Sequence, residues 1–218
     1  MIYIEGNIGV GKTTFLEYLL AYLKEHLSDS IVLKEPVESW MKTQDSNGKS
    51  ILEHYYEDQQ KYGFTFQMNA FISRTKDILD MKKDNGTECP RKLNFVERSV
   101  FTDKNVFMEC NYRRGNISEI EYNIYQQWFN VFSKQFDLGG DVYIYLKTSK
   151  DICNNRIMKR DRTGESGIPL DYLEELNKLH EEWLKREEEN GIKVITIDAG
   201  QDFIKEPERL TAEFDRIM

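Results

Sequence analysis

Cysteine is scarce in this chain, and no hydrophobic run is long. The three cysteines, Cys89, Cys110 and Cys153, are an odd number without a Cys-x-x-Cys spacing, so the sequence predicts neither a disulfide framework nor a zinc site. The longest apolar runs, such as Val142–Leu146, fall far short of the ~20 residues that a membrane span requires. We therefore expect a protein of a reducing compartment that crosses no membrane.

Basic residues are outnumbered as well. The 218 residues include 30 Lys and Arg against 38 Asp and Glu, a net charge of -8 that opposes binding to the phosphate backbone of nucleic acids. No basic or Arg-rich leader precedes the first apolar run, which starts at residue 1 or 2. These absences favour a cytoplasmic protein without a nucleic-acid partner.

The chain does have enough apolar residues for a core, and they are arranged in alternating segments. With 39% hydrophobic residues at this length, we expect one domain over residues 1–218. Apolar runs alternate with stretches of helical period, which predicts an α/β fold with a parallel sheet of strands buried on both faces. The expected strands are Met1–Glu5, Ile31–Lys34, Leu93–Glu97, Asp141–Leu146 and Lys193–Ile197, and the expected helices are about Lys12–Leu27, Glu57–Met81, Thr102–Tyr112, Ser118–Phe136, Lys150–Lys159, Leu170–Asn190 and Phe203–Ile217.

Two polar segments and one apolar stripe add detail. Thr43–Lys49 is a turn-rich cluster typical of a surface loop, and Lys82–Arg91 is interpreted as a connection from helix to strand. Spacings of three and four residues predict one buried helical stripe made of Leu173, Leu176, Leu179 and Trp183.

The strongest motif lies between the first expected strand and the first expected helix. Gly6–Thr13 fits G-x-x-x-x-G-K-[ST], the phosphate-binding loop (P-loop), with strand, loop and helix in the required order. Glycines let the loop turn sharply and bring backbone N–H groups against phosphate oxygens, and the helix N-terminus adds partial positive charge. Lys12 can reach the outer phosphates and Thr13 the magnesium ion. The expected triphosphate contacts are Gly6, Asn7, Gly9, Gly11, Lys12, Thr13 and Thr14.

This loop predicts a nucleoside triphosphate site but no particular reaction. A switch GTPase would carry a guanine-reading Asn-Lys-x-Asp motif, and the nearest match, Asn177–His180, lacks the aspartate. Asp137–Gly140 imitates the Asp-x-x-Gly of such switches, but it lies just before the fourth expected strand and is interpreted as a turn. A switch protein is therefore the weaker interpretation.

Charged residues follow the second and third expected strands, where ligands bind in open α/β sheets. Glu35 follows one strand, and Glu97 and Arg98 end the other. Isolated carboxylates at strand ends are usually solvated. Phosphoryl transfer, however, needs a base near the acceptor hydroxyl and a carboxylate near the magnesium ion. Glu35 and Glu97 can supply one each.

A third charged cluster closes one expected helix and enters a glycine-containing loop. It contains Arg156, Arg160 and Arg162, and arginines four residues apart lie on one helical face. One interpretation is a solvated basic helix end favoured by the helix dipole. The other is a mobile lid over about residues 156–168, which closes on the triphosphate and stabilises charge on the transferring group.

Aromatic residues gather between the second and third expected strands, and most must belong to the core. Polar groups suited to recognition interrupt them. Gln67 could pair with a base edge, and Arg74, seven residues further along the same helical face, could pair with Asp103. A flat pocket with a planar amide and a charged pair at its edge suits a nucleobase.

These residues resemble the deoxyribonucleoside kinase family, and within it the deoxycytidine kinase branch. The resemblance covers nearly the whole chain through IEGNIGVGKTTF, KEPVESW, YGFTFQMNAFISR, FVERSVFTDKNVF, RIMKRDRTGE and GIPLDYLEELNKLHEEWL. It implies the P-loop kinase fold, with a five-stranded parallel sheet, flanking helices and a lid. It further implies transfer of the γ-phosphoryl group of ATP or another nucleoside triphosphate, with Mg²⁺, to the 5′-hydroxyl of a deoxynucleoside, usually by a homodimer with a helical interface.

The resemblance also implies roles for individual residues. Glu35 becomes the base for the 5′-hydroxyl, Arg98 its hydrogen-bonding neighbour, and Glu97 the carboxylate on the magnesium side. Tyr56 and Glu165 would bind the 3′-hydroxyl, although Gly164 stands where the family often has an acid. Gln67 would pair with the base, surrounded by Trp40, Phe66 and Phe107, and the lid arginines would be Arg156, Arg160 and Arg162. Arg74 with Asp103 fits the cytosine- and purine-accepting pattern, and the loop over the donor's base would contain Asp202 and Phe203.

Two other functions remain as alternatives to a deoxynucleoside 5′-kinase of nucleotide salvage. A nucleoside monophosphate kinase of the thymidylate type would share the P-loop and the lid but would need a second phosphate site. A nucleotide-dependent regulatory module would bind a triphosphate and have no acceptor substrate.

Overall fold

Five parallel strands form the centre of the protein in a computed structural model, which describes residues 1–26, 30–84, 93–165, 167–203, 205 and 207–217. The strand order is β2-β3-β1-β4-β5, and every neighbouring pair is parallel. This confirms the predicted five-stranded parallel sheet. The strands are β1 (Ile2–Glu5), β2 (Ile31–Leu33), β3 (Asn94–Glu97), β4 (Val142–Lys147) and β5 (Lys193–Asp198), each within one residue of the expected bounds.

Burial differs between the middle and the edges of the sheet. The central strands β1, β3 and β4 are buried along most of their length. The edge strand β2 is half-buried throughout, and β5 is exposed or half-buried except at Ile197, which is buried. The expectation that all five strands are buried on both faces is therefore wrong for β2 and β5, because an edge strand lacks a neighbour on one side.

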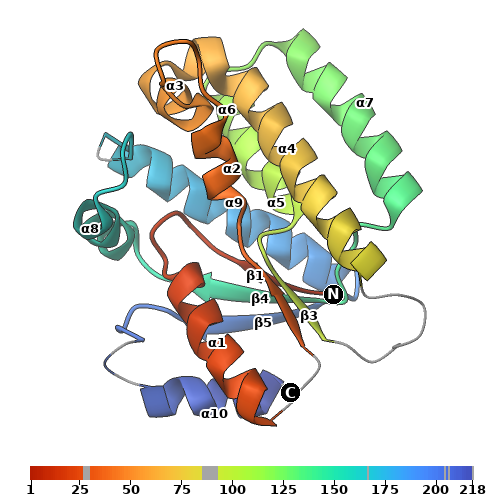
Figure 1. Cartoon of the computed structure of the whole chain (residues 1–218), viewed down its shortest axis with the longest axis vertical. Coiled ribbons are helices and arrows are strands. Elements are labelled where there is room, and N and C mark those ends of the chain that lie inside the picture. The colour runs from red at the N-terminus through yellow and green to blue at the C-terminus, as the bar shows by residue number, and fades with distance from the viewer. Residues whose placement is uncertain (27–29, 85–92, 166, 204, 206, 218) are drawn as a thin grey trace.

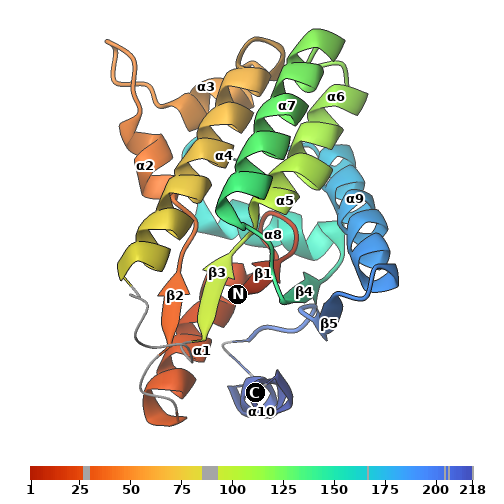
Figure 2. The same ribbon diagram turned by 90° about the vertical axis from the view of Figure 1, so that its right-hand side faces the viewer.

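Helices cover both faces of the sheet. Figures 1 and 2 show α1 and α10 together on one face, while α4, α7 and α9 stand on the other, with the helical run α5-η1-α6 among them. The predicted stripe on α9 is buried in the core. The helices are α1 (Lys12–His26), α2 (Val37–Lys42), α3 (Ile51–Glu57), α4 (Gln59–Asp84), α5 (Val100–Thr102), the π-helix η1 (Asp103–Met108), α6 (Glu109–Arg113), α7 (Glu119–Phe136), α8 (Lys150–Arg160), α9 (Leu170–Glu189) and α10 (Pro207–Ile217).

Three helix predictions need correction. The short helices α2 and α3 were not expected, and α4 begins at Gln59 because Asp58 ends α3. The helix expected over Thr102–Tyr112 starts at Val100, where Ser99 accepts a hydrogen bond from the Thr102 N–H, and it contains a π-helical turn. The last helix begins at Pro207 rather than at Phe203, which lies buried in the preceding loop.

The structure agrees with the predictions for the two polar segments, Thr43–Lys49 and Lys82–Arg91, only in part. Residues 43–48 are exposed between α2 and α3, as expected of a surface loop. Residues 82–84 belong to α4, and residues 85–91 of the expected connection, with Cys89, lie outside the described residues. Cys110 and Cys153 are buried free thiols. Within the described part of the chain, no helix is long and apolar enough to cross a membrane.

Candidate active site

A cleft of about 1210 Å³ opens where β1, β2 and β3 end. One half is formed by the P-loop, α8 and the loop after β5, and the other by α2, α3, α4 and η1. Nearly all residues that the sequence singled out line this one cleft. They are Gly9, Gly11, Lys12, Thr13, Thr14, Glu35, Trp40, Tyr56, Phe66, Gln67, Arg74, Glu97, Arg98, Asp103, Phe107, Arg156, Arg160, Arg162, Glu165, Asp202 and Phe203.

The P-loop has the close backbone contacts that only glycine allows. Gly6 has a φ of +140°, and a Cβ there would lie 2.6 Å from the carbonyl oxygen of Leu146. Gly9 has a φ of +76°, and a Cβ there would lie 2.5 Å from the carbonyl oxygen of Cys153 on α8. A side chain at either position would therefore push the loop away from β4 or from α8.

The ammonium group of Lys12 lies inside the P-loop. Its Nζ donates to the carbonyl oxygens of Asn7 (2.9 Å) and Gly6 (3.3 Å), and the residue is buried. Burial lowers the pKa of Lys12 to about 7, and the nearby charge of Arg98 acts in the same direction. A bound anion would favour the charged form again.

Gly6 and Asn7 do not line the cleft, and Asn7 points its side chain to α9. The Asn7 amide nitrogen donates to the Leu173 carbonyl (2.8 Å) and to Asn177 Oδ1 (2.7 Å), and its Oδ1 accepts from the Ile8 N–H. Asn177 in turn donates to the Thr148 carbonyl after β4 (3.2 Å). Sequence reasoning missed Asn177, because it lies 170 residues from Asn7 and belongs to no local motif.

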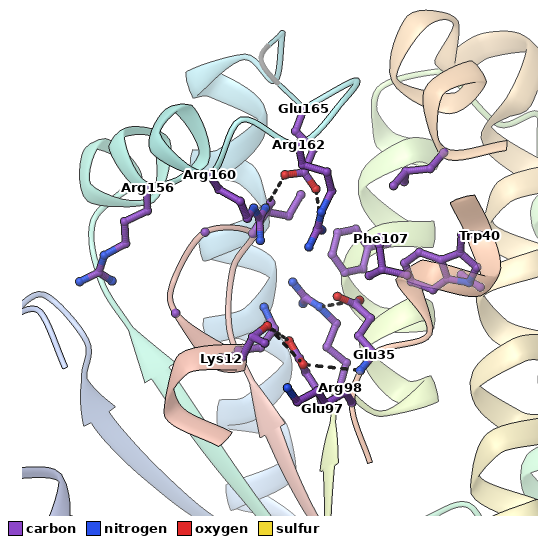
Figure 3. A pocket seen from close by; sticks show the side chains of 18 of the residues that line it. Lys12, Glu35, Trp40, Glu97, Arg98, Phe107, Arg156, Arg160, Arg162 and Glu165 are labelled. Carbon is purple, nitrogen blue, oxygen red and sulfur yellow. Dashed lines mark hydrogen bonds and ion pairs between the residues drawn. The ribbon is translucent and has the colours of Figure 1, made fainter. Parts of the chain in front are cut away.

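Arg156 connects two loops of the cleft half that contains the P-loop, instead of joining the other arginines that the sequence assigned to the lid. Its guanidinium donates to the carbonyl oxygens of Val10 (2.7 Å), Ala199 (2.9 Å) and Gln201 (3.0 Å). Figure 3 shows it turned away from Arg160 and Arg162. Arg156 thus connects the P-loop with the loop after β5, which also carries Asp202 and Phe203.

Glu35 lies between two arginines at the centre of the cleft. Its Oε1 is 2.6 Å from Arg74 Nη2 and 3.2 Å from Arg98 Nε. Burial raises the pKa of Glu35, but the charges of Arg74 and Arg98 outweigh it and hold the pKa at about 2. The carboxylate is therefore ionised at neutral pH, and Arg98 meets it as the sequence suggested.

Thr13 and Glu97 face each other where β3 meets the P-loop. The Thr13 hydroxyl is 3.2 Å and 3.4 Å from the two carboxylate oxygens of Glu97. The described residues contain no cluster of three or more His, Cys, Asp or Glu side chains that could hold a metal. One hydroxyl beside one carboxylate fits Mg²⁺, which usually keeps several waters and is shared with substrate phosphates.

The other half of the cleft is an aromatic box with a charged edge. Trp40 and Phe66 meet edge to face at 5.3 Å, and Arg74 lies 5.1 Å from the Trp40 ring. The Trp40 Nε1–H donates to Ser73 Oγ (2.8 Å), a contact that the sequence did not indicate. Arg74 Nε pairs with both oxygens of Asp103 at 3.0 Å, so the suggested pair is present, although its contact with Glu35 was not foreseen.

Gln67 is buried inside this box. Among the described residues, no hydrogen-bond partner lies within 3.5 Å of its amide oxygen or nitrogen in a suitable geometry. The Tyr55 hydroxyl is nevertheless near enough to interact with the Gln67 side chain. Buried polar groups are nearly always paired in folded proteins. The Gln67 amide is therefore available to a ligand that brings its own hydrogen-bond donors and acceptors.

Described residues of the expected lid also line this cleft. Glu165 is buried, and its carboxylate pairs with Arg160 through one oxygen and with Arg162 through the other at 3.0 Å. Figure 3 shows this carboxylate between the two guanidinium groups. Gly164 packs against α3 near Glu53 and Tyr56. Tyr56 and Glu165 thus lie near each other, and the carboxylate holds the two arginines that the sequence assigned to phosphoryl transfer.

The fold and the site together define the class of protein to which this chain belongs. A P-loop on a parallel sheet, facing an ionised carboxylate across a cleft with a second binding half, is the arrangement of a P-loop phosphotransferase. The chain belongs to the deoxynucleoside kinase family, whose model matches residues 2–217. It is a deoxynucleoside kinase with a nucleoside triphosphate as phosphate donor.

Relatives in viruses and mammals cover most of the chain. A fowlpox virus protein named as a probable deoxycytidine kinase is 36% identical over 99% of this chain and 86% of its own length. The mouse deoxycytidine kinase is 34% identical over 96% of this chain and 87% of its own. The mitochondrial thymidine kinase 2 of Macaca fascicularis is 34% identical over 84% of this chain and 64% of its own length. The family favours a nucleoside acceptor over the monophosphate acceptor of the thymidylate-type alternative.

Proposed function

We propose that this kinase phosphorylates the 5′-hydroxyl of deoxycytidine, and less readily of purine deoxynucleosides, with ATP or another nucleoside triphosphate and Mg²⁺. The single observation that carries the choice of substrate is the buried Gln67 amide, which lines the same cleft as the ion pair of Arg74 and Asp103. This pair can hydrogen-bond an exocyclic amino group or a ring nitrogen. Its bulk occupies the space that a thymine methyl group would need.

The proposed chemistry uses the residues at the centre of the cleft. Glu35 accepts the proton of the 5′-hydroxyl while the oxygen of that hydroxyl forms a bond to the γ-phosphorus. At the same time, the bond between the γ-phosphorus and the β,γ-bridging oxygen breaks, and the nucleoside diphosphate leaves. A pKa of about 2 keeps Glu35 ionised, so it takes the proton only as the attacking oxygen becomes acidic. Arg98 holds the Glu35 carboxylate in place during this transfer.

The half of the cleft formed by the P-loop, α8 and the loop after β5, here called the donor half, supplies positive charge and holds the phosphates. Lys12 and the P-loop N–H groups bind the outer phosphates, and Arg160 and Arg162 stabilise the charge on the transferring group. Thr13 and Glu97 would hold Mg²⁺. When bound, this ion would neutralise charge on the phosphate oxygens. Tyr56 and Glu165 bind the 3′-hydroxyl, and Phe203 packs at the donor end beside Gly11.

A coupled assay for release of the nucleoside diphosphate tests this function. The purified chain is given ATP and each of the four deoxynucleosides, with Mg²⁺ or with EDTA, and deoxycytidine monophosphate serves as a further acceptor. We expect turnover with deoxycytidine above the purine deoxynucleosides, little with thymidine, and none with EDTA. Turnover restricted to the monophosphate would support the thymidylate-type alternative, and no turnover with any acceptor would support a regulatory module.

A second copy of this chain is the proposed partner of α7. Its outer face exposes Ile120, Ile124, Trp128 and Val131 at helical spacing, and Ile72 is exposed on the neighbouring helix α4. Figures 1 and 2 show α4 and α7 side by side at the outside of the molecule. An exposed apolar stripe of this kind is typical of an interface between copies of one chain.

Sedimentation velocity tests this homodimer. The double change Trp128→Lys with Val131→Asp should turn a dimer into a monomer. The matched control is Met158→Lys, because Met158 is also exposed but lies on α8, away from this face. A parent chain that sediments as a monomer at micromolar concentration would contradict the proposal.

A further inference from the structure

The carboxylate of Glu5 is fully buried at the end of β1, next to the P-loop but behind the cleft. Its Oε1 accepts a hydrogen bond from the Ser99 backbone N–H (2.9 Å), and its Oε2 accepts one from the Thr102 hydroxyl. In the described part of the chain these donors are uncharged groups at the start of the helical run α5-η1-α6. Burial raises the pKa of Glu5, whereas the hydrogen bonds from Thr102 and Ser99 act in the opposite direction.

The segment that Glu5 holds contains a strained residue. Arg98 has a φ of +62°, in the left-handed region that residues with a side chain rarely adopt. Such a conformation persists only where its surroundings enforce it. The Arg98 N–H donates to the Ile4 carbonyl (3.0 Å), and Glu5 binds the next N–H along the chain. Two neighbouring residues of β1 thus hold both sides of the turn at Arg98.

This turn decides where the Arg98 guanidinium lies. Its Nε is 3.2 Å from Glu35 Oε1, and the guanidinium stacks 4.8 Å above the Phe107 ring. The helical run that Ser99 caps also carries Asp103 and Phe107 on its π-helical turn, a feature that often occurs at functional sites. A shift at Ser99 would move these cleft residues together with Arg98.

We propose that Glu5 is a positioning residue for the phosphoryl-transfer step, because it fixes the Arg98 turn and thereby the contact between Arg98 and Glu35. The inference rests on the roles proposed above for these two residues. An apolar residue at this position would leave the buried Ser99 N–H without its partner, so the test has to separate loss of stability from loss of catalysis. Glu5 acts through Arg98 and touches neither substrate.

Three variants separate this role from a purely structural one. Glu5→Gln replaces one of the two accepting oxygens by an NH2 group, Thr102→Val removes the Thr102 hydroxyl at similar volume, and Thr102→Ser keeps it. Misplacing a reacting group by about 1 Å can cost about 10²-fold in rate. We therefore expect Glu5→Gln and Thr102→Val to lower kcat about 10- to 100-fold, with the KM for ATP changed less than about threefold, and Thr102→Ser to restore most of kcat.

The matched control is Thr75→Val, which removes another buried hydroxyl, one that donates to the Phe71 carbonyl at 2.8 Å. We expect its kcat, normalised to folded enzyme by circular dichroism, to stay within about twofold of the parent. A melting temperature lowered with kcat preserved in both Glu5→Gln and Thr102→Val would make Glu5 merely structural and overturn the inference.

A double-mutant cycle with Arg98→Ala tests whether Glu5 acts through Arg98. We expect Glu5→Gln to lower kcat little further once Arg98→Ala is present, because the group that it positions is gone. Independent, multiplicative losses would overturn the inference while leaving the proposed function intact. A parent enzyme that phosphorylates no deoxynucleoside would instead refute the proposed function, and this inference with it.

Discussion

The acceptor half of the cleft, formed by α2, α3, α4 and η1 with Glu35 and Arg98 at its base, differs from the lid in how it holds its arginines. At the acceptor half, the side chains of Arg74 and Arg98 are only 4% and 2% exposed. In the lid, Arg160 and Arg162 are 35% and 30% exposed, and both depend on the single carboxylate of Glu165. Arg74 and Arg98 come from α4 and from the end of β3, whereas the lid arginines come from the end of α8 and the loop that follows.

The two regions therefore differ in how far their charged side chains are fixed in place before substrate binds. Buried ion pairs on rigid elements keep their geometry whether or not substrate is present, so the acceptor half orders its charges when the chain folds. In the lid, Glu165 is the residue proposed to bind the 3′-hydroxyl, and the same carboxylate holds the two arginines proposed to act on the γ-phosphate. Acceptor binding at Glu165 and charge placement at the donor are therefore connected through one side chain.

The largest effect should come from the centre of the acceptor half. Glu35→Gln removes the group proposed to take the proton while keeping its size, and loss of a general base costs roughly 10²- to 10⁴-fold. We expect kcat to fall by that factor and the KM for deoxycytidine to change far less, measured by steady-state kinetics. Glu17→Gln is the control, because Glu17 pairs with Lys34 on the surface. Near-full kcat in Glu35→Gln would leave Glu97 as the candidate base.

The next effect tests whether the lid arginines act on the reaction rather than on folding. Arg160→Ala or Arg162→Ala should each reduce kcat by on the order of 10²-fold, as expected for charge clamps on a transferring phosphoryl group. Because both side chains are partly exposed, the melting temperature should change little. The control Arg113→Ala removes an exposed arginine paired with Glu109. A large loss of stability with kcat preserved would instead identify a structural helix end.

The sequence was sufficient where a feature leaves a strong local pattern. The strands follow from short apolar runs, and the P-loop follows from glycines and a lysine within eight residues between a strand and a helix. The helices α2 and α3 were missed because they are six and seven residues long, too short for a hydrophobic period to be recognised. The π-helical turn of η1 also leaves no periodic signal of its own.

Contacts between distant segments could not be predicted. Glu5 meets Ser99 across 94 positions, and Asn7 meets Asn177 across 170. The sequence suggested that Arg74 pairs with Asp103, but the second contact, to Glu35, depends on how α4 packs beside the loop after β2. Partners of this kind are selected by packing rather than by spacing along the chain.

The contact between Arg74 and Glu35 affects how the test of base selection has to be read. Arg74→Met with Asp103→Ala removes both the polar match to cytosine and the bulk beside a thymine methyl group. Absolute activity should fall, because Arg74 also holds Glu35 at 2.6 Å. The ratio of kcat/KM for thymidine to that for deoxycytidine should nevertheless rise, by about 10- to 200-fold on the scale of a methyl group in a pocket.

The single variant Arg74→Met is the control for the double variant at Arg74 and Asp103. Arg74→Met alone leaves the buried Asp103 carboxylate without its cation, which typically costs about 3–5 kcal/mol of stability. The double variant should therefore melt higher than this single one. A parent enzyme that already prefers thymidine would remove the pair as the specificity element.

The smallest expected effect is a pH dependence of proton uptake when the triphosphate binds, and it comes from the charge of Lys12 in the donor half. Burial lowers the pKa of Lys12 to about 7, so the free enzyme carries a charged Lys12 below that pH and a neutral one above it. Because a bound triphosphate favours the ammonium form, binding must take up a proton when Lys12 starts neutral. Calorimetry in buffers of different ionisation enthalpy should find uptake of about 0.1 proton at pH 6 and about 0.9 at pH 8. Lys12→Met, measured in parallel, should lose this difference, and equal uptake by the parent at both pH values would show that the buried ammonium keeps its proton without a phosphate beside it.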